Sequence, residues 1–510
     1  MGIKLSQKAK GILSIFGSCF IYLVIGSTFM WGSINIYAAS YFKNLTTDQV
    51  SIVFPVSFTI TNVSILLSFP ILRYIGFRMT VYLSTFLMFS FFFASTFCPD
   101  FWSFFCCFAV GFGGSSGLLY LTLMYNNYKY FPSRRGLIGG ISMGMYGLAA
   151  LISNYILLLL INPKNIKAIK NPETNQYSFP DEIADRFPSA LRYLSYYFIS
   201  IMIIGSLLQF EYEEPEPEKL ADEDDGIIVD VRVEEESVLA QKPEDLRAEL
   251  LPKSLTLEGD FLKENLDKDI QIAQTANPQS NIEEDITEVS EQKLEVAKIR
   301  KNKTAWSVAS MDSHDERHCK SILDAFKSRV VYIIMVMMYM SSSNGYFMAM
   351  NFKNYGITKI SDDGFLTLVG SLSSLCNGGS RLFWGFAADK FDFKKIYLTM
   401  LVIQILEIAT LRFVSTYEIP YLLWVCTSLL CEGGHFVIFP PLSLKVFGPN
   451  VGSKIYSLLL LACSATNLTQ YMLNLVLRPL IGFDNEFYIF LGMTIVALVF
   501  CISSELRFKK

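Results

Sequence analysis

Twelve stretches of the chain consist mostly of apolar residues, with few charged positions inside them. Each is about 18–25 residues long, enough for a helix to cross the hydrocarbon core of a membrane. They lie near residues 12–37, 51–72, 80–98, 103–127, 137–161, 190–210, 329–350, 364–386, 395–413, 420–444, 454–477 and 485–504. The pattern predicts an all-α polytopic membrane protein with twelve transmembrane helices in two groups of six.

A polar segment, residues 211–328, separates the two groups. It opens with EYEEPEPEKLADEDD and contains almost no aromatic residues, so it can bury too little apolar surface to offset the entropy of ordering. Its last residues, CKSILDAFKS, place apolar side chains at helical spacing. We expect an N-terminal six-helix bundle in residues 1–210, a mostly disordered linker in 211–328 with a short helix near its end, and a C-terminal bundle in 329–510.

Basic residues near the ends of the stretches indicate the orientation, because they favour the cytosolic side of a membrane. Those on one side are Lys4, Lys8, Lys10, Arg73, Arg78, Lys129, Arg134, Arg135, Lys390, Lys394, Lys395, Arg507, Lys509 and Lys510. The loop 162–189 on the opposite side also carries basic residues, so the asymmetry is incomplete. We expect both termini and the linker in the cytosol, and the plasma membrane as the location, with an organelle membrane as the alternative.

Composition narrows the function further. The chain is 52% hydrophobic and 18% charged, and its 10 cysteines stand mostly inside the apolar stretches, where we expect free thiols. It has no phosphate-binding loop, which argues against an ATP-driven pump. It also has no set of nucleophile, base and acid residues, so we expect no enzyme. No cofactor, metal site or nucleic-acid partner is expected.

Arg381 is the only charged residue between Phe365 and Ala388. An arginine at the centre of a lipid-facing helix costs about 2.5–3.5 kcal/mol on insertion scales, so such a residue usually faces a cavity or a partner. Its planar fork matches the geometry of a carboxylate. The alternative is that its long side chain reaches toward the cytosolic interface. We favour the cavity, because Asn377 and three small residues directly precede Arg381.

Glu432 and His435 stand three residues apart in the tenth stretch, and therefore on one face of a helix. One interpretation is a proton relay or a counter-charge to Arg381, since ionisable residues inside a membrane usually serve a function. The other is an ion pair or hydrogen-bonded contact that holds helices together. Both interpretations stay open.

Several segments resemble the oxalate/formate antiporter-like group of the major facilitator superfamily, which is related to monocarboxylate transporters. They are KYFPSRRGLIGGISMGMYGLAAL (residues 129–151), IGSTFMWGSINIY in the first stretch, and NGGSRLFWGFAADKFDFKK in the eighth. The two halves also echo each other, since a glycine-rich stretch precedes YFPSRRG in one and VFGPNVG in the other. The likeness covers both apolar halves and none of 211–328.

The resemblance implies the major facilitator fold, with a solute site between two six-helix bundles. It further implies that Arg381 binds the solute and that aromatic and polar residues line the path. The expected solute-binding residues are Arg381, Trp31, Tyr120, Asn344, Tyr346, Asn377 and Cys463. Cys463 stands where the oxalate antiporter has a second cationic residue, a lysine. One cation in place of two suits a monocarboxylate better than a dianion.

A gating contact is also implied by the resemblance. Asp389 is expected to face Arg134 and Arg135 at the start of the fifth helix and to hold the halves together on the cytosolic side. The alternative is a solvated loop charge.

These observations predict a secondary transporter of small organic anions that works by exchange or proton symport. The single cation favours monocarboxylates. The expected partners are the anion, protons or a counter-anion, and the lipid bilayer, with the protein a monomer. One alternative is a carrier of amino acids or another neutral polar solute. A second is a non-transporting sensor that signals through residues 211–328.

Overall fold

A computed structural model describes residues 5–170, 176–213 and 321–504. For Ser133, Arg135, Gly136, Asp389, Pro449 and Asn450 only the backbone is described. Most of the expected linker, residues 214–320, lies outside the described residues. The short helix expected near the end of the linker is present as α13 (Ile322–Lys327).

The described residues before the linker form the N half, residues 5–213. Its elements are α1 (Gln7–Ile25), η1 (Gly26–Met30), α2 (Trp31–Phe42), α3 (Thr47–Val50), α4 (Val53–Ile75), α5 (Phe77–Ser95), α6 (Phe101–Phe105), the π-helical turn η2 (Cys106–Phe112), α7 (Gly113–Tyr130), η3 (Pro132–Arg134), α8 (Arg135–Ile161), β1 (Ile169–Lys170), β2 (Tyr177–Ser178), α9 (Asp181–Ala184) and α10 (Phe187–Leu207). Strands β1 and β2 pair antiparallel, a minor exception to the all-helical expectation.

The described residues after the linker form the C half, residues 321–504. Its further elements are α14 (Arg329–Ser341), α15 (Ser343–Gly356), α16 (Asp363–Lys390), α17 (Phe393–Val414), α18 (Glu418–Phe447), α19 (Pro449–Val476), α20 (Arg478–Ile481) and α21 (Phe483–Ser503). Both halves belong to one compact unit.

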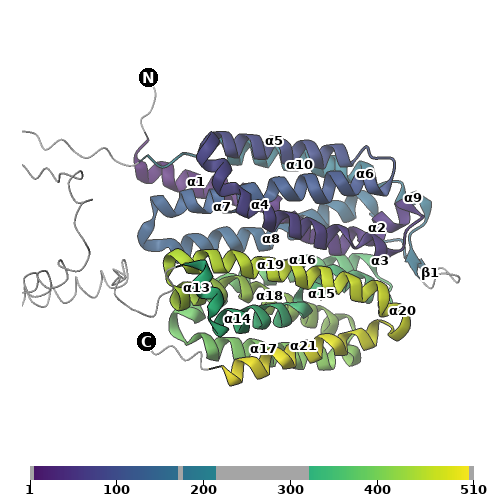
Figure 1. The fold of residues 1–510 in the computed structure, drawn as a ribbon. Coiled ribbons are helices and arrows are strands. Elements are labelled where there is room, and N and C mark those ends of the chain that lie inside the picture. The colour runs from purple at the N-terminus through teal and green to yellow at the C-terminus, as the bar shows by residue number, and fades with distance from the viewer. Residues whose placement is uncertain (1–4, 171–175, 214–320, 505–510) are drawn as a thin grey trace, which may run out of the picture. The chain divides into compact units, whose positions relative to one another are not determined.

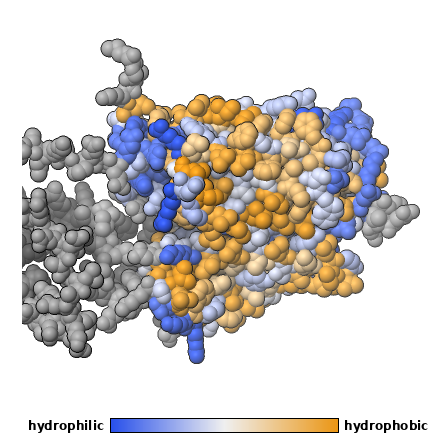
Figure 2. Space-filling model, turned by 45° about the horizontal axis from the view of Figure 1, so that its top comes forward, coloured by the Kyte–Doolittle hydropathy of each residue, from blue (hydrophilic) through white to orange (hydrophobic). Residues whose placement is uncertain are grey.

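The twelve predicted spans are confirmed. Eleven helical segments in the described part of the chain are long and apolar enough to cross a membrane. The twelfth, α16, has 28 residues but is less apolar, because it carries Arg381 together with several Gly, Ser and Asn residues. Figure 2 shows apolar residues along the flank of the molecule and polar ones toward its two ends, as the lipid core requires.

Helix α1 begins and α21 ends at the same end of the molecule, which we call the near end (Figure 1). Elements α3, α9, α20 and β1 lie at the opposite, far end (Figure 1). The two halves pack against each other through α8 with α16, α4 with α19, and α2 with α15. A site between the halves can therefore draw on all six of these helices.

The first and seventh spans, one from each half, lie at this interface, and the regular α-helix of each is interrupted. The first changes to a 3-10 turn over Gly26–Met30, and the seventh breaks at Ser342 between α14 and α15. A Cβ atom on Gly26 would lie 2.1 Å from the Tyr146 carbonyl oxygen, so glycine allows the first span to approach α8 closely. Broken helices near the membrane centre are common where transporters bind solutes.

Candidate functional site

Arg381 lies at the junction of the two halves. Its helix, α16, packs against α18 of the C half and α8 of the N half, and its side chain has 0% exposure. The guanidinium carbon is 4.7 Å from the centre of the Phe436 ring and 5.5 Å from that of Tyr146. These rings come from α18 and α8 respectively. The guanidinium is thus enclosed by both halves and does not extend to the near-end surface.

The hydrogen bonds of Arg381 are incomplete. Its Nη2 donates to Asn377 Oδ1, one helical turn earlier, at 3.1 Å. Its Nε and Nη1 have no hydrogen-bond partner among the described residues, and no carboxylate of these residues forms an ion pair with it. A buried charge without a partner is strongly unfavourable. The arrangement therefore suits an acceptor with two oxygens, such as a carboxylate.

Aromatic side chains from both halves surround the guanidinium. Tyr120 lies close enough to interact electrostatically with Arg381, and its ring meets that of Tyr146 edge-on with 5.3 Å between centroids. On the other side, the Tyr346 and Phe436 rings lie 6.5 Å apart. These rings give the guanidinium apolar surroundings on both sides. Among the predicted liners, Tyr120, Tyr346 and Asn377 thus lie around Arg381.

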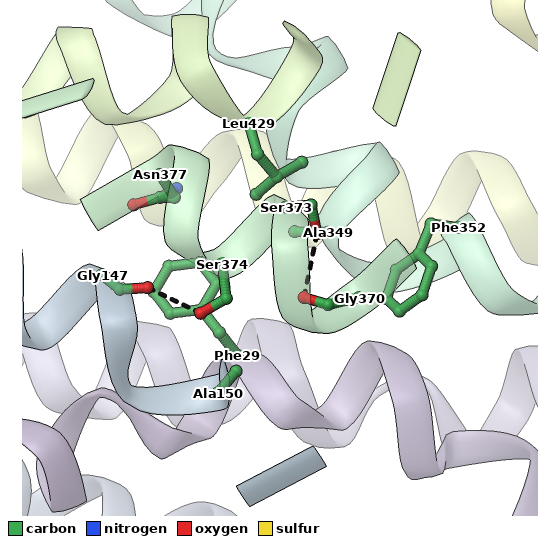
Figure 3. A pocket seen from close by; sticks show the side chains of 10 residues that line it. All are labelled: Phe29, Gly147, Ala150, Ala349, Phe352, Gly370, Ser373, Ser374, Asn377 and Leu429. Atoms are coloured by element: carbon green, nitrogen blue, oxygen red, sulfur yellow. Dashed lines mark hydrogen bonds between the residues drawn. The ribbon is translucent and has the colours of Figure 1, made fainter. Parts of the chain in front are cut away.

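A cavity of about 20 Å³ lies next to this cluster, between the halves (Figure 3). Asn377 lines it together with Phe29 and Gly147 of the N half. Ser374 donates a hydrogen bond of 2.8 Å to the Gly147 carbonyl across the interface (Figure 3). The cavity has room for about one water molecule. The halves must therefore move apart before a solute can reach Arg381.

Glu432 and His435 share one face of α18, as predicted, but their partners differ. Glu432 Oε2 lies 3.7 Å from His435 Nδ1, and neither carboxylate oxygen has a hydrogen-bond partner in the described part of the chain. His435 Nε2 instead lies 2.8 Å from the Ser341 hydroxyl, and its ring stacks on Phe439. Glu432 is close enough to Arg381 to interact electrostatically. Glu432 therefore belongs to the Arg381 cluster, whereas His435 faces the interior of the C half.

The other predicted liners lie elsewhere. Trp31 packs inside the N half against Phe104 and Phe108, at centroid distances of 5.9 and 5.3 Å. Asn344 donates hydrogen bonds to Glu407 at 2.7 Å and to Ser428 at 2.8 Å, both within the C half.

Cys463 is buried beside the Arg381 cluster, since its thiol interacts electrostatically with Tyr346 and Glu432. It faces the same region as Arg381 but carries no fixed positive charge. The side chains of Asp389 and Arg135 in the predicted gating contact lie outside the described residues, and Arg134 is exposed.

Sequence reasoning overlooked a second group of buried charges. Lys353 and Asp363 form an ion pair of 2.7 Å with 0% and 1% of their side chains exposed. Arg478, Asp48 and Glu486 form another ionic cluster near the far end. The segment NFKNYGITKISDDGF resembles a polar loop, so nothing in it marked Lys353 as buried. The sequence does place a lysine and an aspartate, Lys353 and Asp363, on either side of the short connection between the seventh and eighth spans, and this pairing of opposite charges could have indicated an ion pair.

Comparisons with known proteins agree with this architecture. Residues 15–444 match the model of the Major Facilitator Superfamily. Apicoplast pyruvate carrier 1 of Toxoplasma gondii is 32% identical over 120 residues, which are 23% of this chain and 22% of that protein. The oxalate:formate antiporter of Oxalobacter formigenes is 24% identical over 127 residues, 25% of this chain and 30% of the antiporter. The chain thus matches less than a third of the length of either relative.

A solved structure resembles the whole fold. The crystal structure of a D-xylose-proton symporter superimposes with a TM-score of 0.56, covering 98% of both chains at 12% sequence identity. At this identity the likeness concerns the fold alone.

Proposed function

Because the chain belongs to the Major Facilitator Superfamily and is a membrane transporter, we propose that it carries small organic anions, above all monocarboxylates. Transport proceeds by alternating access, either as exchange or together with protons. The observation that carries this proposal is the enclosed guanidinium of Arg381, with Nε and Nη1 free to donate. A carboxylate can accept two parallel hydrogen bonds along one edge of the guanidinium, from Nη2 together with either Nε or Nη1, because Nη2 uses only one of its two N–H groups on Asn377.

The number of cations favours one carboxylate over two. Cys463, beside Tyr346, supplies no second positive charge at the cluster. Lys353 is paired with Asp363, which lies 18 residues before Arg381 on α16, about 27 Å along the helix. A second carboxylate at the Arg381 cluster would therefore meet apolar rings and the Glu432 side chain. The names of the two partial relatives, a pyruvate carrier and an oxalate:formate antiporter, fit a carboxylate solute.

A panel of solutes tests the proposal. Purified protein in liposomes is expected to take up radiolabelled monocarboxylates with saturation, and unlabelled monocarboxylates should compete better than dicarboxylates or sugars. Preloading the liposomes with a carboxylate distinguishes exchange, and an imposed pH gradient distinguishes proton symport. Uptake of a sugar without competition by any carboxylate would contradict the proposal.

Glu432 favours a second candidate, an amino acid. Its carboxylate is buried close to Arg381 and Tyr346, and its one ion-pair partner among the described residues is His435, at 3.7 Å. A zwitterion could place its carboxylate at Arg381 and its ammonium at Glu432, which would pair both buried charges.

Replacing Glu432 with Gln separates the two candidates. If the solute is an amino acid, Glu432→Gln removes the partner of the ammonium and should weaken uptake by at least about tenfold, the equivalent of 1.4 kcal/mol. If the solute is a monocarboxylate, exchange should persist, and only dependence on a pH gradient should change. The measurement is competition by amino acids and by monocarboxylates in wild-type and variant liposomes, with Glu407→Gln as control. Glu407 is also buried but bonds to Asn344.

A further inference from the structure

Polar contacts cross between the two halves at the far end, where α3 and α20 lie (Figure 1). Two clusters contain ion pairs, and a further contact joins Asn165 of the N half to Asp362 and the Gly364 backbone N–H of the C half at 2.9 and 2.8 Å. The first clamp consists of Tyr37 and Asn162 of the N half with Lys353 and Asp363 of the C half. The second clamp consists of Asp48 of the N half with Arg478 and Glu486 of the C half.

In the first clamp, Asp363 is the shared acceptor. Lys353 Nζ lies 2.7 Å from one carboxylate oxygen, Oδ1. The other oxygen, Oδ2, accepts hydrogen bonds from the Tyr37 hydroxyl and, at 2.7 Å, from Asn162 Nδ2. Lys353 also donates to the Tyr37 and Thr367 hydroxyls at 3.2 and 3.1 Å. Two neutral donors of the N half thus bind a carboxylate whose counter-ion belongs to the C half.

In the second clamp, Arg478 is the shared donor. Its Nε donates to Glu486 of the same half at 2.8 Å, and its Nη1 donates to Asp48 of the N half. Nη2 donates to Asn351 at 3.2 Å, and the Phe483 ring lies 3.7 Å from the guanidinium carbon. The pattern repeats that of the first clamp, since one ion of the C half has a counter-ion within its own half and a partner in the other.

This shared pattern has a physical consequence. Buried ion pairs add little net stability, but removing one partner leaves an uncompensated buried charge, which is strongly unfavourable. When the halves separate at the far end, Asp363 loses Tyr37 and Asn162 but keeps Lys353. Arg478 loses Asp48 but keeps Glu486. Neither ion of the C half is left without a counter-charge as the far end opens.

We propose that the two clusters are reversible clamps of the far end, in which Lys353 and Glu486 act as resident counter-ions that make opening feasible. The partners in the N half, Tyr37, Asn162 and Asp48, hold the end closed. The resident counter-ions lower the cost of release, because they stay with Asp363 and Arg478 when the halves separate and Lys353 loses only its 3.2 Å hydrogen bond to Tyr37. The proposal concerns the movement of the halves and does not depend on which solute Arg381 binds.

Cross-linking across the far end measures closure. Lys167 of the N half and Lys359 of the C half line one cavity of about 380 Å³ there. Both are replaced by Cys in the full chain, and a protease site is introduced within residues 214–311. A short bifunctional thiol reagent then keeps the halves together on a denaturing gel after cleavage. The same chain without the two new cysteines gives the background from native thiols.

The proposal predicts effects of opposite sign. Tyr37→Phe combined with Asp48→Asn removes partners of the N half and should lower the ratio of closed to open far ends about tenfold, for about 1.4 kcal/mol of lost contact. Cross-linking should slow accordingly. Lys353→Met leaves Asp363 dependent on the N half, so cross-linking should be as fast as in the parent or faster, while solute uptake slows. Adding Asp363→Asn to Lys353→Met removes the unpaired charge and should restore opening.

A merely structural role for Lys353 gives a different result. In that case Lys353→Met would slow cross-linking, as is expected of the Tyr37→Phe and Asp48→Asn variant, and adding Asp363→Asn would not reverse the effect. Either result would overturn the proposal, as would unchanged cross-linking in the Tyr37→Phe and Asp48→Asn variant. If Lys353→Met does not fold, Glu486→Gln tests the same prediction at the second clamp, with the same expected sign.

Discussion

Replacing Arg381 with Ala should abolish saturable carboxylate uptake while the protein still reaches the membrane. Truncating one partner of a buried, hydrogen-bonded charge pair costs about 2–5 kcal/mol, which corresponds to roughly 30-fold to several thousand-fold in affinity. Folding should tolerate the change, because the side chain has one hydrogen bond, to Asn377, and no ion pair among the described residues. The measurement is initial uptake in liposomes at equal amounts of reconstituted protein.

Two further variants show whether a loss of uptake in Arg381→Ala comes from the missing guanidinium. Arg381→Lys keeps the charge but loses the planar fork, so it should retain weak uptake with a raised KM. Arg192→Ala removes another arginine of a predicted span, one that contacts Thr96 and the Phe97 ring within the N half. This control should transport normally. Normal uptake by Arg381→Ala, with the protein folded and inserted, would show that the solute binds elsewhere.

The length of apolar runs predicted the twelve spans because the hydrocarbon core sets a minimum length for any helix that crosses it. Their interruptions could not be predicted in the same way. The 3-10 turn at Gly26–Met30 and the π-helical turn at Cys106–Phe112 change backbone hydrogen bonds without changing hydropathy. Even α16, predicted as a span, is less apolar than the other eleven, because the residues around Arg381 serve the interface between the halves.

Among the candidate site residues, the charged ones could be placed from the sequence more readily than the neutral ones. Arg381 could be identified from the sequence as a buried candidate because a charge inside an apolar run is energetically costly and therefore rare. Which way a neutral side chain faces is not encoded in its type. Trp31 and Asn344 were assigned to the solute path, yet their partners are Phe108 and Glu407, inside the separate halves. Lys353 was not predicted to be buried because its neighbours in the sequence are polar.

Replacing Gly378 with Ala tests how closely α16 must approach α8 for transport. A Cβ atom at this position would lie 2.6 Å from the Gly144 carbonyl oxygen and 2.7 Å from Leu148 Cγ, both in α8. The carbonyl cannot move without displacing the helix, so Gly378→Ala should force α8 and α16 apart beside Arg381. We expect uptake to fall at least about tenfold, as overpacking of a tight contact costs about 1–3 kcal/mol. Initial uptake rates in liposomes measure the effect.

The neighbouring residue supplies a matched control. A Cβ atom on Gly379 would meet no atom within 4 Å, although the residue stands in the same helix and has the same intrinsic helix propensity. Gly379→Ala should therefore transport like the parent, and a Gly378→Ala defect cannot be attributed to a stiffer α16. Cross-linking between positions 167 and 359 should slow in Gly378→Ala only, because separation of α8 from α16 disfavours the closed arrangement. Equal uptake and equal cross-linking in both variants would mean that the approach of α8 to Gly378 is not required for transport.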